Sequence, residues 1–272
     1  MLTLHSSLLM PSPLDRLSAD FKSEIGIPAL LTLPCTSPEA KAYDLSGNNN
    51  LGSLNGGVTT TPGGFGVLGA SWSLNGTTGN IGGIPLSFSS LSQYTIAVLA
   101  KLTSVATVQA LFDTSDGTHG DSILANVSAT DWRWQVQDSS ATAITCSTSR
   151  TDGEWVLYGI SSTGQAAGQT KLYTNSVHQD DAHAISQAFG TVNIGFQKGP
   201  SNSNSRFVGG NIAFAAVWTT ALSDAQHLDL YNCLLTGEPF PLFQPQTAAM
   251  MMGSAAAPAG GGILLRRRRA AA

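Results

Sequence analysis

The chain has 272 residues, of which 42% are hydrophobic and only 11% are charged. This apolar content is enough for one substantial core, so the length fits one large β domain with tails, or two small domains. The formal net charge of −4 gives no reason to expect nucleic-acid binding by the folded body, since four of the 13 basic residues are clustered at Arg266–Arg269.

The N-terminus lacks the features of a secretory signal. Met1–Met10 has no basic start, and its short apolar run ends at Pro11 and Pro13. No stretch approaches the roughly eighteen apolar residues of a membrane span. We therefore expect no membrane anchor, and release from the producing cell by a route such as lysis.

Residues 1–28 are predicted to be a lead-in segment. Leu14, Leu17 and Phe21 recur at helical spacing ahead of Gly26, which predicts a short amphipathic helix. Such a helix would either cap the main domain or dock onto a partner, and the spacing favours neither.

Short β-strands separated by turns are predicted from Pro28 onward. Turns are expected at 44–50 and 113–121, whereas Gly56–Gly69 is expected to be a loop that lacks the lysine and helix start of a phosphate-binding loop. Residues 212–218 are apolar at every position, which predicts a central strand. The predicted strands are 29–33, 94–100, 110–112, 132–136, 155–160, 171–174 and 212–218.

A helix and a tail follow the strands. Ser223-Asp-Ala-Gln226 has the form of a capping box, which predicts a helix to about Asn232 with Leu228 and Tyr231 facing inward. Residues 237–272 form the predicted tail, which either stays flexible or acts as a docking peptide in an assembly.

The chain contains three widely spaced cysteines, an odd number. This pattern favours buried thiols over a zinc site, and one disulfide with a spare thiol remains an alternative. The cysteines are Cys35, Cys146 and Cys233.

Several short motifs occur in a fixed order along the chain. They are Asp44-Leu-Ser-Gly-Asn48, Tyr94-Thr-Ile-Ala97, Thr151-Asp-Gly-Glu-Trp155 with Lys171-Leu-Tyr173, and Gly209-Gly-Asn-Ile-Ala213 to Trp218 with Ala221-Leu-Ser223. Over roughly residues 29–236 this order resembles the LamG-like, concanavalin A-like jelly-roll family. The resemblance implies an all-β, two-sheet antiparallel jelly-roll sandwich with a short C-terminal helix and extended termini. Many members of this family bind glycans, and one branch contains β-glucan hydrolases.

The C-terminal part is similar to proteins encoded in phage and prophage structural regions. This second resemblance rests on Leu230-Tyr231, Pro239-Phe240-Pro-Leu-Phe243 and the arginine-rich terminus. It implies a virion protein that is made in the host cytoplasm without a signal peptide and is extracellular after release. Its partners would be other virion proteins or copies of itself.

The acidic residues do not fit the hydrolase branch. Those enzymes carry a Glu-x-Asp-x-x-Glu strand, in which two carboxylates on one face share the chemistry. None of the four glutamates has an acid two residues away in a strand pattern, and no serine lies in a Gly-x-Ser-x-Gly elbow. We therefore expect a protein without enzymatic activity. The glutamates are Glu24, Glu39, Glu154 and Glu238.

Calcium is the one cofactor that the resemblance implies. Its candidate ligands share one acidic loop, although a plain turn rich in Asp and Gly explains that loop equally well. These ligands are Asp113, Asp116 and Asp121. His178 and His183, near Asp180 and Asp181, are interpreted as a solvated hairpin tip rather than a metal site.

Sugar binding in such folds typically uses an exposed aromatic ring beside amide or charged side chains. Trp134, Trp155 and Trp218 are expected in the core, whereas two other tryptophans have more loop-like neighbours. The candidate sugar-binding residues are Trp72, Trp132, Asn202, Asn204 and Arg206.

The leading hypothesis is a non-enzymatic phage virion component, such as a decoration, fibre or tail-associated protein. It would present the sandwich outward to host-surface glycan. The competing hypothesis is a bacterial cell-surface or secreted carbohydrate-binding module.

Overall fold

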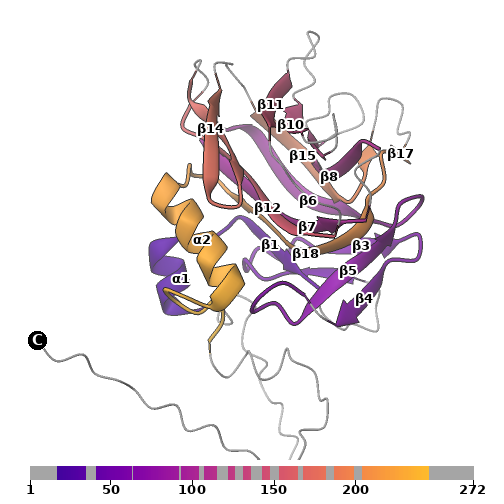
Figure 1. Cartoon of the computed structure of the whole chain (residues 1–272), viewed down its shortest axis with the longest axis horizontal. Helices are drawn as coiled ribbons and strands as arrows, with labels where there is room; N and C mark the ends of the chain where they lie inside the picture. The colour runs from indigo at the N-terminus through magenta and orange to yellow at the C-terminus, as the bar shows by residue number, and fades with distance from the viewer. Residues whose placement is uncertain are drawn as a thin grey trace, which may run out of the picture.

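The computed structural model packs two β-sheet layers face to face, with two helices against the outer face of one layer (Figure 1). This arrangement confirms the predicted two-sheet sandwich with a short C-terminal helix. Within the described residues, neither helix has the length and apolar character that crossing a bilayer demands. The structure describes residues 17–34, 41–62, 64–91, 93–103, 107–114, 122–125, 131–135, 143–147, 153–164, 168–181, 187–198 and 204–244.

One layer, sheet I, carries the helices on its outer face. Its strands are β1 (Leu30–Leu33), β4 (Thr59–Pro62), β5 (Ala70–Asn75), β7 (Tyr94–Leu102), β12 (Trp155–Ser162), β13 (Thr170–Thr174), β14 (Val177–Asp181) and β18 (Gly209–Trp218). Their order is β1-β18-β7-β12-β13-β14, and β5 joins β4 to the first half of β18. β18 is a central strand, as predicted, and it is apolar from Ile212 to Trp218 because both of its faces are covered there.

The other layer, sheet II, follows the order β11-β10-β9-β8-β15-β6-β3. Its strands are β3 (Gly52–Asn55), β6 (Asn80–Leu91), β8 (Gln109–Asp113), β9 (Ser122–Ala125), β10 (Asp131–Gln135), β11 (Ala143–Ser147) and β15 (Gln187–Ile194). β2 (Lys41–Asp44) pairs with both β1 and β3 and so links the two layers. A short hairpin of β16 (Gln197–Lys198) and β17 (Asn204–Ser205) lies beside β8.

The turn that follows β2 is organised by one buried carboxylate. Asp44 Oδ1 accepts hydrogen bonds from the backbone N–H of Leu31 at 3.1 Å and of Ser46 at 2.8 Å. Its Oδ2 accepts from the Ser46 hydroxyl at 2.8 Å and from the Asn50 backbone N–H at 3.0 Å. Gly47 has a φ of 92° in this turn. The Asp-Leu-Ser-Gly-Asn motif is therefore a structural turn, as predicted, and its acid is occupied by hydrogen bonds.

One predicted loop contains a strand. Residues 59–62 lie inside the Gly56–Gly69 segment and pair with β5 as β4. Three consecutive β-branched threonines favour extended backbone here, and glycines on both sides conceal so short a strand in the sequence.

Two apolar cores hold the molecule together. The first lies between the sheets and includes Trp72, Ile96 and Ile194. The second lies between sheet I and the helices and includes Phe21 from the first helix and Trp218 of β18. The first helix, α1 (Ala19–Glu24), therefore caps the sandwich, one of the two outcomes expected for it.

The second helix, α2 (Asp224–Thr236), begins with the predicted capping box at Ser223 and extends one turn beyond the predicted end. His227, Leu230 and Leu234 form its buried stripe, at the i, i+3, i+7 spacing of one helical face. The prediction that Leu228 faces inward is wrong, because Leu228 lies off this stripe and is 44% exposed. Tyr231 is half-buried against the second core.

Cys233 is a buried free thiol on α2. Burial, followed by the negative charge of Asp229, raises the pKa of Cys233 to about 12. The predicted buried thiol is confirmed for this residue. Cys35 lies outside the described residues, as does the side chain of Cys146.

Candidate functional site

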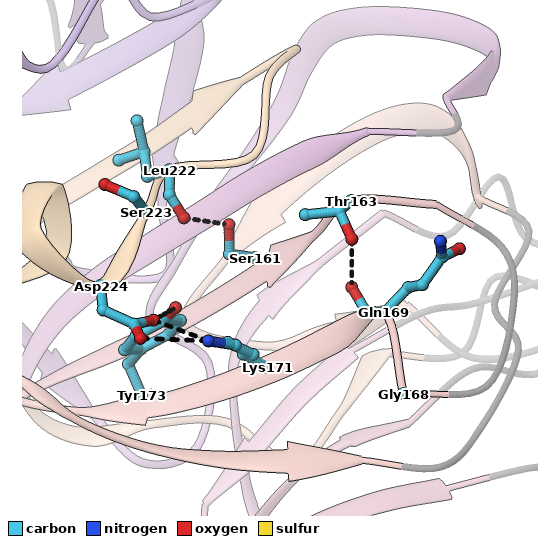
Figure 2. A pocket seen from close by; sticks show the side chains of 9 residues that line it. All are labelled: Ser161, Thr163, Gly168, Gln169, Lys171, Tyr173, Leu222, Ser223 and Asp224. Carbon is cyan, nitrogen blue, oxygen red and sulfur yellow. Dashed lines mark hydrogen bonds and ion pairs between the residues drawn. The ribbon is translucent and has the colours of Figure 1, made fainter.

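A pocket of about 210 Å³ opens where the β12–β13 hairpin meets the segment leading into α2. Figure 2 shows Leu222, Ser223 and Asp224 on one side, Thr163, Gly168 and Gln169 on the other, and Lys171 between them. The lining residues are Ser161, Thr163, Gly168, Gln169, Lys171, Tyr173, Leu222, Ser223 and Asp224. Most of these side chains end in a hydroxyl, an amide or a charged group.

Asp224 is the electrostatic centre of the pocket. Lys171 Nζ lies 3.0 Å from Asp224 Oδ1 and 3.1 Å from Oδ2, and the Tyr173 hydroxyl donates to Oδ1 at 2.7 Å. The hydrogen bond from Tyr173, followed by that from Lys171, lowers the pKa of Asp224 below its ordinary value. The carboxylate is therefore ionised at neutral pH, and its side chain is 49% exposed.

Buried hydroxyls hold the pocket's Leu222 wall in place. Thr95 Oγ1 accepts a hydrogen bond from the Leu222 N–H at 2.8 Å and donates to the Thr220 carbonyl at 2.9 Å. The Ser161 hydroxyl donates to the Leu222 carbonyl at 2.8 Å (Figure 2). Thr95 and Ser161 are opposed across β7 and β12. The two strands thus fix the backbone that precedes α2.

The opposite wall is held by the hairpin turn. The Thr163 N–H donates to the Gln169 carbonyl at 2.9 Å, which closes the turn. The Gln169 side chain lies over Gly164, where a Cβ would collide with its amide oxygen. Glycine at position 164 therefore makes room for this orientation of Gln169.

A buried histidine packs against Tyr173, one of the residues that line the pocket. The His227 ring stacks on Tyr173 with centroids 3.5 Å apart and an interplanar angle of 14°. The ring also packs on Gly159, where a Cβ would come within 3.0 Å of His227 Cε1. Both ring nitrogens are buried, and neither has a hydrogen-bond partner among the described residues. Burial lowers the pKa of His227 to about 3, so the ring is neutral at physiological pH.

The sequence matches the model of a known protein family. The model of the concanavalin A-like lectin/glucanases superfamily matches residues 75–226, which is more than half of the chain and includes every pocket residue. The chain belongs to this superfamily. A search of curated proteins found no match.

Solved structures share the superfamily fold at low sequence identity. Domain 4 of AbnA, a GH43 extracellular arabinanase from Geobacillus stearothermophilus solved with arabinotriose, has a TM-score of 0.55 and 20% identity. That match covers 69% of this chain and 91% of the other. The receptor binding domain of botulinum neurotoxin C/D mosaic serotype has a TM-score of 0.59 and 13% identity, over 76% of this chain and 51% of the other. This chain thus spans about half of that toxin domain.

The two tryptophans predicted to bind sugar lie in the between-sheet core of this superfamily domain. Trp72 and Trp132 are both 0% exposed. Trp132 Nε1 donates to Thr174 Oγ1 at 2.8 Å, and its ring meets Tyr158 edge-on at 5.4 Å, so it bridges sheet II to sheet I. A sugar stacks only on a free ring face. The expectation of exposed stacking rings is therefore wrong for both residues.

Of the polar sugar-site candidates, neither Arg206 nor Asn204 is among the residues that line the pocket. Arg206 is half-buried with a φ of 52°, and its carbonyl accepts a hydrogen bond from Ala110 N–H beside β8. Burial, then the charge of Arg133, lowers the pKa of Arg206. Asn204 pairs with Lys198 in the β16–β17 hairpin, and Asn202 lies outside the described residues.

The calcium candidates are described only at Asp113. This residue ends β8, is 0% exposed, and accepts hydrogen bonds from Lys198 N–H at 3.2 Å and Asn193 Nδ2 at 3.4 Å. Asp116 and Asp121 lie outside the described residues. Among those that are described, no three His, Cys, Asp or Glu side chains group as metal ligands.

His178 lies within β14, and the hairpin turn is at 175–176. His178 Nδ1 is 3.6 Å from Asp224 Oδ2, so this histidine borders the pocket instead of occupying the predicted tip. His183 lies outside the described residues. The pocket residues gave little sequence signal, because Lys171 and Asp224 are 53 positions apart. The motifs Lys171-Leu-Tyr173 and Ala221-Leu-Ser223 and the capping box at Ser223 marked segments of the pocket, but none of them indicated that these segments meet.

Proposed function

We propose that this chain is a non-catalytic carbohydrate-binding domain and that the pocket beside Asp224 is its sugar site. The carrying observation is the pocket lining, which gathers a carboxylate, an ammonium, an amide and hydroxyls on a rigid frame. Sugar hydroxyls both donate and accept hydrogen bonds, so they match such a mixed set. The similar fold of the AbnA domain solved with arabinotriose supports this ligand class.

Asp224 and Lys171 have complementary roles in this proposal. The half-exposed carboxylate accepts hydrogen bonds from adjacent sugar hydroxyls, and the ammonium donates to a third oxygen. Tyr173 keeps the carboxylate oriented, and the buried hydroxyls of Thr95 and Ser161 keep the walls fixed. Preorganisation of this kind reduces the entropy lost on binding.

The lining also favours binding over hydrolysis. Retaining and inverting glycosidases need two carboxyl groups that flank the scissile bond. Asp224 is the single carboxyl group among the described residues that line the pocket. We therefore propose a domain that holds sugar without cleaving it.

Binding to a panel of immobilised oligosaccharides, with arabinotriose included, tests this function. We expect Asp224→Asn to weaken binding about tenfold or more, since a hydrogen bond to a charged group contributes about 1.5–3 kcal/mol. Asp229→Asn, on the same helix but outside the pocket, is the matched control and should bind like the wild type. If the two variants bound equally well, this pocket would not be the sugar site. Release of reducing sugar by the wild type would overturn the non-catalytic assignment.

We further propose that the domain works on a phage virion, where it presents the sandwich to host-surface glycan. The support is the resemblance of 230–231, 239–243 and the arginine-rich terminus to phage structural proteins. Mass spectrometry of purified particles tests it, and we expect the chain in stoichiometric amounts. Its absence from particles, together with tight binding to a glycan, would favour the competing bacterial carbohydrate-binding module.

A further inference from the structure

The helices do not cover all of the outer face of sheet I. In Figure 1, β4 and β5 extend away from the two helices. One row of directly opposed residues runs there from β12 through β7, β18 and β5 to β4. This outer row consists of Trp155, Lys101, Asn211, Ser73 and Thr59. Neighbouring strands lie about 4.8 Å apart, so the row is about 19 Å long.

Side chains of the outer row point away from the between-sheet core. Trp72 and Leu74 on either side of Ser73 belong to that core, and so does Ile212 next to Asn211. Successive side chains of a strand alternate between faces, so the row residues face outward. Thr59 is exposed and the other four are half-buried.

The middle of the outer row offers hydrogen-bonding groups to a ligand. Asn211 Nδ2 donates to Ser71 Oγ at 3.1 Å and to Thr61 Oγ1 at 3.4 Å, which orients the amide and leaves its oxygen as an acceptor. Within the described part of the chain, the hydroxyls of Ser73 and Thr59 make no hydrogen bond. The row therefore presents a preoriented acceptor beside two hydroxyls.

One end of the outer row is aromatic and positively charged. Trp155 contacts Phe65 with ring centroids 6.2 Å apart, and Phe65 contacts Tyr231 at 6.1 Å. Lys101 Nζ lies 5.3 Å from the Trp155 ring centroid. Across the described residues Lys101 has no ion-pair partner. The row itself contains one cation and no carboxylate, so its charge complements a neutral or acidic ligand.

We propose that the outer row binds an extended oligosaccharide chain laid across the strands. The half-buried Trp155 ring borders one sugar unit, and Lys101, Asn211 and Ser73 bind the hydroxyls of that unit and the following units. The outer row is distinct from the Asp224 pocket, because Trp155 and Ser161 lie at opposite ends of β12, about 20 Å apart. The choice of a sugar as ligand rests on the proposed function, whereas the location of the outer row is independent of the Asp224 pocket.

Affinity electrophoresis in gels containing dextran, laminarin, arabinan or polygalacturonate tests the outer row. The test variant is Lys101→Met with Asn211→Ala, which removes the cation and the oriented amide from half-buried positions. Lys41→Met on β2 is the charge-matched control, and Asp224→Asn reports on the pocket. An unchanged urea midpoint establishes that the double variant folds.

We expect at least one of these polysaccharides to retard the wild type, and the double variant to show about tenfold weaker apparent affinity. Lys41→Met should migrate like the wild type. If the double variant and the wild type are retarded equally in every gel, the outer row is not a binding site. If only Asp224→Asn then loses retardation, the pocket is the sugar site. Loss in the double variant alone supports the row and counts against the pocket. No retardation of the wild type in any gel overturns both sites.

Discussion

Protonation of His227 should make the stability of this domain strongly dependent on pH. The ring is 0% exposed, stacks on Tyr173 and packs on Gly159. Burial lowers its pKa from 6.5 to about 3, because the charged ring would lose its hydration without gaining a hydrogen bond. The nearby charges of Asp224, Lys171 and His178 act on it to a smaller extent.

The sign follows from the number of protons bound in each state. Between pH 6.5 and about 3 the unfolded chain binds a proton at this residue and the folded chain does not. Acidification therefore favours unfolding, and the contribution present above pH 6.5 is lost as the pH falls. At pH 5 the loss corresponds to about 1.5 pH units, or about 2 kcal/mol of unfolding free energy.

Urea unfolding at pH 8, 7, 6 and 5 measures this term. We expect the wild type to lose about 2 kcal/mol more than His227→Phe between pH 8 and pH 5, whatever the absolute stability of the variant. Contributions from carboxyl groups are shared by the two proteins and cancel in the difference. Parallel pH profiles for the wild type and His227→Phe would refute the assignment of a neutral, buried His227.

Three further predictions concern stability and are measured by urea unfolding. Gly159→Ala should cost about 1–3 kcal/mol because the added methyl crowds the buried ring packed on it, whereas Gly69→Ala, with open space around it, should change stability by less than about 0.5 kcal/mol. Ser223→Ala removes the helix cap and should cost about 1 kcal/mol, and an unchanged midpoint would contradict the capping role. Trp72→Ala and Trp132→Ala should each cost about 3–5 kcal/mol, while a cost below 1 kcal/mol would indicate surface rings.

The sandwich could be predicted from the sequence because several of its strands and turns are specified by nearby residues. The apolar run from Ile212 to Trp218, the Asp44 turn and the Ser223 capping box each depend on neighbours within a few residues. Periodicity and turn chemistry therefore placed seven strands and the C-terminal helix, but not β5 or the long β6. β4 was missed because its pairing with β5 is not visible in a short glycine-flanked segment.

Burial of individual rings was decided by tertiary contacts. Trp132 was expected at a surface, yet it is buried because Thr174 and Tyr158 of sheet I cover it from the opposite layer. Trp155 was expected in the core, yet it is half-buried at the start of β12. Alternation along a strand assigns a face, but the partner that covers that face comes from distant sequence.

The sequence by itself indicated seven of the strands, the superfamily resemblance and the position at which α2 begins. Only the tertiary structure brought Lys171 to Asp224 and aligned the outer row from Trp155 to Thr59. Local backbone preferences act over a few residues and are legible in one sequence. Ligand-binding surfaces in this sandwich are built from side chains of several strands, and their register is set by pairing between segments far apart in the chain.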